Sequence, residues 1–196
     1  MYEKTIMKKV YNKPCLVCTR SASSPSGIII YDITNGSANE TITYYHTSIG
    51  KFLISEDATR LYGSLKDIYV LPSYDAQFHS SSPPIVGQIN SEFNTICAID
   101  ECPAINSIFA AFSSYNYSTG VTETSPYIDQ FSTTNLGKIR EFNVSPVYVT
   151  ENGINSVYET GARYVFVNKE GSMLIAVKNL KESYNKEYWT IETFQL

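Results

Sequence analysis

Two histidines and four cysteines are among the side chains of this 196-residue chain that could support metal binding or nucleophilic chemistry. Cys15 and Cys18 form a C-x2-C spacing, and Cys97 and Cys102 form a C-x4-C spacing, which together suggest a zinc site. The first pair, however, lies in an apolar run typical of a strand, where its two thiols would point to opposite faces of a sheet. We expect buried free thiols, with a metal site or a disulfide as the alternatives.

Acid–base chemistry has few candidates. His46 and His79 lack a neighbouring nucleophile motif such as G-x-S-x-G, so we interpret His46 as a turn residue that bonds the backbone and His79 as a solvated residue of a Ser-rich loop. The pairs Glu56-Asp57 and Asp100-Glu101 could bind calcium or act as an acid and base, but adjacent carboxylates usually form turns. We predict no catalytic residue, no metal site and no cofactor, and we expect that the protein is not an enzyme.

The charge balance argues against a nucleic-acid partner. The formal net charge is -4, and the one dense basic spot, Lys8-Lys9 with Lys4 and Lys13, is better explained by a solvated strand edge. No run approaches the ~18 apolar residues of a membrane helix, and the first residues lack the apolar core of a secretory signal. We expect a cytoplasmic or nuclear protein, with secretion as the less favoured alternative.

Composition favours strands over helices. The chain contains 16 tyrosines and 9 phenylalanines and is 43% hydrophobic and 17% charged, which fits a single globular domain rich in strands and turns. No segment of ten or more residues shows convincing helical periodicity, and the best candidate, Asn179–Lys186, is expected to be a loop or a single turn. The predicted fold class is all-β.

The strand pattern repeats about four times along residues 1–196, in units 5–45, 46–90, 91–145 and 146–196. The second unit is the clearest: its strands are expected at Lys51–Ile54, Arg60–Leu65, Asp67–Leu71 and Ile85–Ile89, with a turn at Ser55–Ala58. The third unit carries a long polar insertion, Ser113–Pro126. Each unit is predicted to be a four-stranded antiparallel meander.

These units resemble blades of WD-repeat or YVTN-like β-propellers. His46 with ISEDATRLYGSLKDIYVL is similar to a blade in which a His-containing turn leads into an inner strand, a polar turn and two further strands. Tyr31-Asp32 stands where such a blade has its Trp-Asp dipeptide. The resemblance implies a propeller, yet the family usually closes rings of seven or eight blades. The chain would then be either a closed small ring or part of a larger propeller completed by another chain.

Two further expectations concern closure. Residues 1–7 are the candidate closing strand of the last unit, because that unit ends without an evident outer strand. Glu151–Val177 also resembles the repeat of four-bladed hemopexin-like propellers, which is the alternative family.

The resemblance implies a non-catalytic scaffold for protein–protein interaction, a subunit of an intracellular assembly that binds a protein partner or forms an oligomer. The alternatives are a four-bladed ligand- or ion-binding module and a propeller-type hydrolase. Aromatic side chains on ordered loops are the usual interface anchors. The candidate interaction residues are Phe78, His79, Tyr115, Tyr117, Tyr184, Tyr188 and Trp189.

Overall fold

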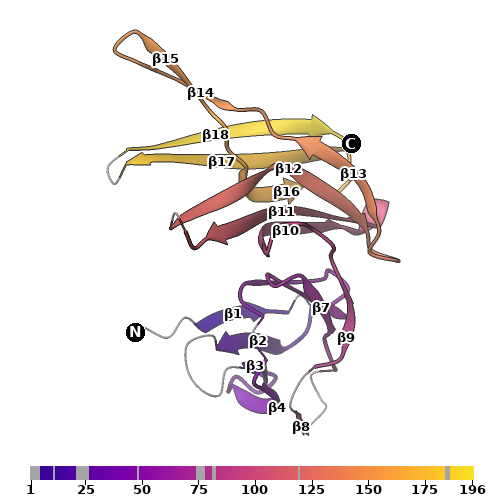
Figure 1. The fold of residues 1–196 in the computed structure, drawn as a ribbon. Helices are drawn as coiled ribbons and strands as arrows, with labels where there is room; N and C mark the ends of the chain where they lie inside the picture. Colours follow the sequence, from indigo (N-terminus) through magenta and orange to yellow (C-terminus); the bar gives the residue numbers. More distant parts are fainter. Residues whose placement is uncertain are drawn as a thin grey trace. The chain divides into compact units, whose positions relative to one another are not determined.

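The structure is a computed structural model in which regular structure is almost entirely β strand (Figure 1). The 3-10 turn η1, Pro103–Ile105, is the one helical segment among the residues described, which confirms the all-β prediction. The structure describes residues 5–10, 12–20, 27–47, 49–73, 78–80, 83–118, 120–183 and 186–196. The chain divides into two compact units, Met1–Gln88 and Ile89–Leu196, each with its own apolar core.

The first sheet of the N-terminal unit has the strand order β1-β2-β3-β4-β8, antiparallel except for a short parallel pairing of β4 with β8. Its strands are β1 Thr5–Lys9, β2 Cys15–Arg20, β3 Gly27–Asp32, β4 Asn39–Tyr45 and β8 Phe78–Ser80. Gly27–Ile30 is buried throughout, because β-branched isoleucines fill both faces of a central strand.

Strand β1 corrects the expectation that residues 1–7 close the last repeat. Thr5 pairs with Arg20 and Met7 with Cys18, so Thr5–Met7 form an edge of the first sheet. Residues 1–4 lie outside the described part of the chain. The connection from β1 to β2 is short, and a short loop costs less closure entropy than a strand exchange across the whole chain.

The second sheet has the order β5-β6-β7-β9. Its strands are β5 Phe52–Ile54, β6 Arg60–Gly63, β7 Asp67–Val70 and β9 Ile85–Gln88, close to the ranges expected from the sequence. In the predicted turn between β5 and β6, Asp57 accepts hydrogen bonds from the Ser55 hydroxyl at 2.6 Å and the Thr59 amide at 3.0 Å. These bonds hold Ala58 in a left-handed conformation, at φ 55°.

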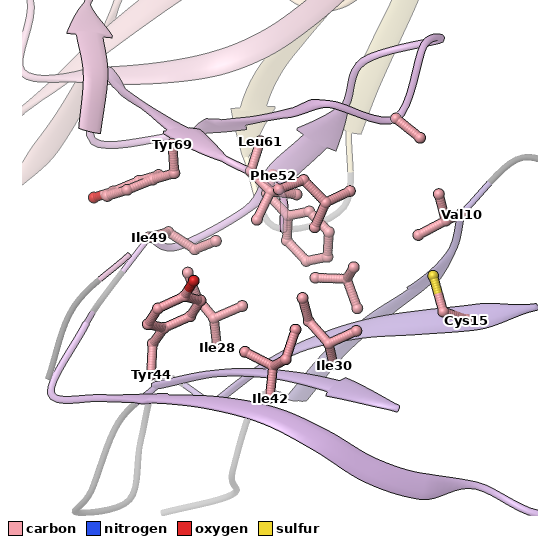
Figure 2. Close-up of a cluster of buried hydrophobic side chains, with 13 residues drawn as sticks. Val10, Cys15, Ile28, Ile30, Ile42, Tyr44, Ile49, Phe52, Leu61 and Tyr69 are labelled. Atoms are coloured by element: carbon pink, nitrogen blue, oxygen red, sulfur yellow. The ribbon is translucent and has the colours of Figure 1, made fainter. Parts of the chain in front are cut away.

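The two sheets of this unit pack face to face around one apolar core (Figure 2). The first sheet and its β1–β2 connection contribute Val10, Cys15, Val17, Ile28, Ile30, Ile42 and Tyr44, and the second sheet with its flanking turns contributes Ile49, Phe52, Ala58, Leu61, Tyr69 and Leu71. The core of the unit therefore lies between sheets, as in other packed β structures.

The third sheet belongs to the C-terminal unit and has the order β10-β11-β12-β13. Its strands are β10 Thr95–Cys102, β11 Ser107–Asn116, β12 Val121–Ser132 and β13 Lys138–Asn143. The expected polar insertion at Ser113–Pro126 is instead the continuation of β11 and β12 into a long hairpin. Tyr115 pairs with Thr122 there, since tyrosine and threonine suit a pleated strand even where the sequence is polar.

The fourth predicted repeat forms a hairpin and a separate three-stranded sheet. The hairpin pairs β14 Val147–Glu151 with β15 Ile154–Tyr158, and the sheet consists of β16 Ala162–Val167, β17 Met173–Ser183 and β18 Lys186–Gln195. The loop expected at Asn179–Lys186 is therefore mostly strand, with residues 184–185 outside the described part. Asn152 and Gly153 have φ values of 49° and 79°, which suit the two-residue turn of the hairpin.

The third sheet and the last sheet share the second core. Buried members are Cys102, Phe109, Ala111, Ile128, Phe142, Val144, Ala162, Val165, Leu174 and Ala176, with Phe194 packed against them. The Phe142 ring lies 6.1 Å from that of Phe109 and 5.5 Å from that of Phe194, measured between centroids. The aromatic contacts therefore join strands of both sheets.

We predict that Phe109→Ala lowers the free energy of unfolding of the C-terminal unit by about 3–5 kcal/mol, because it leaves a large cavity at a fully buried position. Urea denaturation followed by the fluorescence of Trp189, which lies in the same unit, measures the loss. Ile139→Ala, at a side chain that is 54% exposed, is the control and is expected to change stability by about 0.5 kcal/mol or less. Equal losses in both variants would contradict the assignment of this core.

Candidate functional site

The last sheet has one buried face and one exposed apolar face. On β16, Val165 is buried whereas Tyr164 and Phe166 are 48% and 50% exposed. On β18, Trp189 and Ile191 are 51% and 71% exposed. Side chains alternate across a strand, so the buried residues fill the core and their neighbours point the other way.

Strand register brings these exposed side chains together. Tyr164 is opposite Val177, which is opposite Ile191, and Phe166 is opposite Ile175. The Tyr164 and Trp189 rings are stacked, with centroids 6.2 Å apart and planes inclined by 21°. We call this surface the open face; it consists of Tyr164, Phe166, Ile175, Val177, Trp189 and Ile191.

A second exposed aromatic group lies where β11 turns into β12. The Tyr115 and Tyr117 rings meet edge to face at a centroid distance of 5.0 Å, and the two side chains are 49% and 89% exposed. Asn116 orders the turn, because its side-chain oxygen accepts from the Ser118 amide at 3.0 Å and its backbone oxygen from the Gly120 amide at 2.8 Å. We call Tyr115–Tyr117 the hairpin tip.

A buried ion pair fixes the segment that leads from β13 to β14. Lys178 Nζ donates to Glu192 at 3.1 Å and to the Ser145 backbone oxygen at 2.7 Å. The Ser145 amide and hydroxyl both donate to the Glu192 carboxylate, at 2.9 Å and 2.7 Å. Burial would raise the pKa of Glu192, but the hydrogen bonds from Ser145 and Lys178 and the charge of Lys178 outweigh it and lower that pKa.

Tyr188, which precedes Trp189 on β18, makes a hydrogen bond within the fold. Its hydroxyl donates to a carboxylate oxygen of Glu151, which ties the start of β18 to the end of β14. Tyr188 is half-buried, so its phenol is used within the fold, whereas the Trp189 indole belongs to the open face.

The seven predicted interaction residues do not form one described group. Tyr115 and Tyr117 are together at the hairpin tip, and Trp189 is on the open face. Phe78 and His79 lie in β8, not in a loop, and pair with Ile42 and Thr43; their side chains, like Tyr184, are outside the described part. The roles of all seven residues in binding stay predictions.

The open face also contains five residues that the sequence analysis did not select, namely Tyr164, Phe166, Ile175, Val177 and Ile191. The signal available for most of them was the two runs Tyr164–Val167 and Met173–Val177, in which apolar residues occupy both strand faces. That pattern is typical of a strand covered on both sides, so it gave no reason to expect an exposed surface.

All four cysteines are free; Cys15, Cys18 and Cys102 are buried, whereas Cys97 is half-buried. Cys15 lies in the first core and Cys18 is buried on the other face of β2, and burial raises the pKa of both thiols. Cys102 Sγ contacts the backbone oxygen of Asn168 at 3.6 Å. Within the described ranges, no group of three or more His, Cys, Asp or Glu side chains is placed to hold a metal ion.

The acidic pairs also have structural roles. Burial would raise the pKa of Asp57, but hydrogen bonds from Ser55 and Thr59 and the charge of Arg60 lower it, as suits a turn former. Asp100 accepts a hydrogen bond from the Val167 amide at 2.9 Å and thereby links β10 to β16, and burial raises the pKa of its carboxyl group.

His46 lies in the turn after β4, at φ 61°. No helix in the described part of the chain is long and apolar enough to cross a membrane.

Comparison with solved structures identifies the fold as that of β-propellers. The chain is similar to Kuenenia stuttgartiensis hydrazine synthase (TM-score 0.54, 14% identity, 93% of this chain and 43% of that one). It is also similar to the Neurospora crassa Pan2 WD40 domain, with a TM-score of 0.50 and 10% identity over 85% of this chain and 56% of that one. A third similar structure is the tricorn protease, with a TM-score of 0.50 and 10% identity over 95% of this chain and 17% of that one. All three have β-propeller folds, so the blade-like sheets predicted from the sequence are confirmed.

These similarities establish the fold and not an activity, since the identities are 14% or less. The chain spans between 17% and 56% of the length of these three solved chains. No protein-family model and no curated protein sequence matches it. The division into four blades stays a prediction.

We predict that Glu192→Gln destabilises the C-terminal unit by about 2 kcal/mol at pH 7, because Lys178 is 6% exposed and loses its charged partner. The folded pKa of Glu192 lies below its ordinary value of 4.5, so the stabilisation is present above that value and is lost as the pH falls through the folded pKa. The difference between variant and parent should therefore shrink as the pH is lowered below 4.5 and through the folded pKa of Glu192.

Urea denaturation at several pH values measures this difference. Glu159→Gln changes an exposed acid of the same unit and is the matched control, expected to change stability by about 0.5 kcal/mol or less at every pH. A Glu192→Gln effect that does not depend on pH would show that the carboxylate charge is not what stabilises the connection.

Proposed function

We propose that this protein is a non-catalytic scaffold for protein–protein interaction and a subunit of an intracellular assembly. Its fold supports the proposal, because propellers present rigid rims and faces on which loops and strand ends are held in place. The similarity to the Pan2 WD40 domain agrees with such a use but does not name a partner.

The observation that carries the proposal is the ordered pair of exposed tyrosines at the hairpin tip. Tyr117 is 89% exposed, yet its ring is held against Tyr115, and Asn116 fixes the turn around both. An aromatic side chain that is already ordered loses little conformational entropy on binding, which makes tyrosine a common interface anchor. The hairpin tip is therefore the proposed contact with a protein partner.

Charge and thiol chemistry support the class of partner and the compartment. A formal net charge of -4 does not favour counterion release from nucleic acid, so a protein is the better partner. The four cysteines are free, and free thiols persist most readily in the reducing cytoplasm or nucleus.

We predict that affinity capture with the tagged chain retains a specific protein from lysate of the cells that express it. Replacing the tip in a Tyr115→Ala, Tyr117→Ala double variant should reduce retention at least about tenfold, as expected when an aromatic anchor is removed. Quantitative mass spectrometry of the captured proteins measures the ratio.

Tyr148→Ala is the matched control, because Tyr148 is a 73% exposed tyrosine on the other hairpin of the same unit. It should leave retention unchanged. If the parent chain enriches no protein, the scaffold proposal fails; if the double variant retains the partner fully, the assignment of the hairpin tip fails.

The non-catalytic part of the proposal has its own test. We expect no hydrolysis of a panel of lactones above the rate without protein, since Cys15 packs in a core and His46 and Asp57 lie in turns. A spectrophotometric assay with the purified chain measures this rate. Turnover that is abolished by a single acidic or histidine substitution would favour the hydrolase alternative.

A further inference from the structure

The chain contains two Asn-Gly dipeptides, and both lie in exposed turns between strands. Asn35-Gly36 lies between β3 and β4, and Asn152-Gly153 is the two-residue turn between β14 and β15. Gly36 and Gly153 have φ values of 76° and 79°, and among the described residues no atom beyond their chain neighbours lies within 4 Å of where either would carry a Cβ. The two turns therefore have the same reacting residues and similar access to water.

An Asn-Gly dipeptide can react with itself, because glycine has no side chain to block the approach of its amide nitrogen to the preceding side chain. The glycine amide nitrogen loses its proton and attacks Cγ of the asparagine. A C–N bond forms, and the side-chain nitrogen takes up a proton and leaves as ammonia. Water then adds to either carbonyl carbon of the resulting succinimide ring and opens it, which yields aspartate or isoaspartate without any oxidant or reductant.

The two glycine amides differ in whether the fold uses them. The Gly36 amide donates to the Ile33 backbone oxygen at 3.2 Å, so its nitrogen must give up a hydrogen bond before it can attack. Glu151 and Ile154 are the last pair of the hairpin ladder, and a two-residue turn between such a pair does not use the amide of its second residue. Among the described residues, the Gly153 amide has no backbone hydrogen-bond partner.

The turns also differ in how firmly they are held. Before Asn35, the Asp32 carboxylate accepts hydrogen bonds from the Thr34 amide at 2.8 Å and the Thr34 hydroxyl at 2.5 Å, and the turn joins two inner strands of a five-stranded sheet. β14 and β15, in contrast, form a two-stranded sheet (Figure 1). A two-stranded hairpin opens at a low free energy, which lets Asn152 leave its left-handed conformation and turn its side chain towards the next amide nitrogen.

We propose that Asn152 is a site of spontaneous deamidation in the folded protein, and that the fold protects Asn35 from the same reaction. The rate at Asn152 should exceed the rate at Asn35 about fivefold, the factor expected when only one of the two reactions must first break a hydrogen bond. Each conversion adds a negative charge beside Glu151, and isoaspartate also adds a methylene group to the main chain of the turn. Modification therefore weakens the hairpin from its tip. This inference does not depend on the proposed scaffold function.

Peptide mapping of the whole chain, kept folded at mildly alkaline pH, tests the proposal. Trypsin cleaves after Lys and Arg, so Asn152 and Asn35 fall in different peptides, residues 141–163 and 21–51. Mass spectrometry measures the ratio of acid to amide at each asparagine, and chromatography separates aspartate from isoaspartate. We expect both products to accumulate about five times faster at Asn152 than at Asn35.

The same measurement in guanidinium chloride is the matched control. Unfolding removes the hydrogen bond to Ile33 and both strand ladders, so the two rates should become similar, since the reacting groups are the same. Asn152→Gln is a second control. It should abolish the main acidic species that anion exchange separates from the parent chain, whose formal net charge is -4, because the longer side chain must close a larger ring and does so more slowly.

Each of three results would overturn the proposal. A rate at Asn152 no higher than that at Asn35 in the folded chain would show that the fold does not protect Asn35. A preference for Asn152 that persists unchanged in guanidinium chloride would assign it to the neighbouring sequence and not to the turn. Aspartate without isoaspartate at Asn152 would show that water attacks the side-chain amide directly, with no part for the Gly153 nitrogen.

Discussion

Packing of one β sheet on another is the interaction on which this structure depends. Neither unit has a helix to cover a sheet within the described residues, so the two cores form where the apolar face of one sheet packs on the apolar face of another. In the N-terminal unit Ile30 and Ile42 meet Phe52 and Leu61, and in the C-terminal unit Phe142 meets Phe194. Sheets of this kind carry apolar residues on both faces, which explains the high content of aromatic and β-branched residues.

Polar side chains hold the turns and loops between strands, whose backbone groups are not paired in a sheet. Asn168 accepts the Ser172 and Met173 amides at 2.9 Å and 2.8 Å and so shapes the turn between β16 and β17. Asp57 does the same between β5 and β6, and Glu192 holds Ser145. Each is a short side chain or a partly buried carboxylate that accepts hydrogen bonds from backbone amides that have no partner within the turn. Ordered connections of this kind keep exposed aromatic residues such as Tyr115 and Tyr117 in fixed positions.

Local sequence patterns predicted much of the fold. Which strands pair or pack with segments distant in the sequence was harder to predict. The isoleucine run of β3 and the Ser55–Ala58 turn could be read from neighbouring residues. The position of β1 could not, because edge strands of similar composition can pair with several neighbours. The Asn152-Gly153 dipeptide is a clear signal for a two-residue hairpin turn, but the interpretation as four repeats did not use it. The exposure of Trp189 depends on what covers its sheet, which local sequence does not record.

The last sheet has a covered apolar face and an exposed apolar face on the same strands. Val165, Leu174 and Ala176 are covered by the third sheet, whereas Tyr164 and Ile191, on the opposite side of the same strands, are exposed. Both sets are apolar, so the hydrophobic effect acts on each to a similar extent per unit area. A neighbour that binds only the folded sheet would also stabilise it by mass action. A partner that covers the open face would therefore make the stability of the C-terminal unit depend on the concentration of that partner.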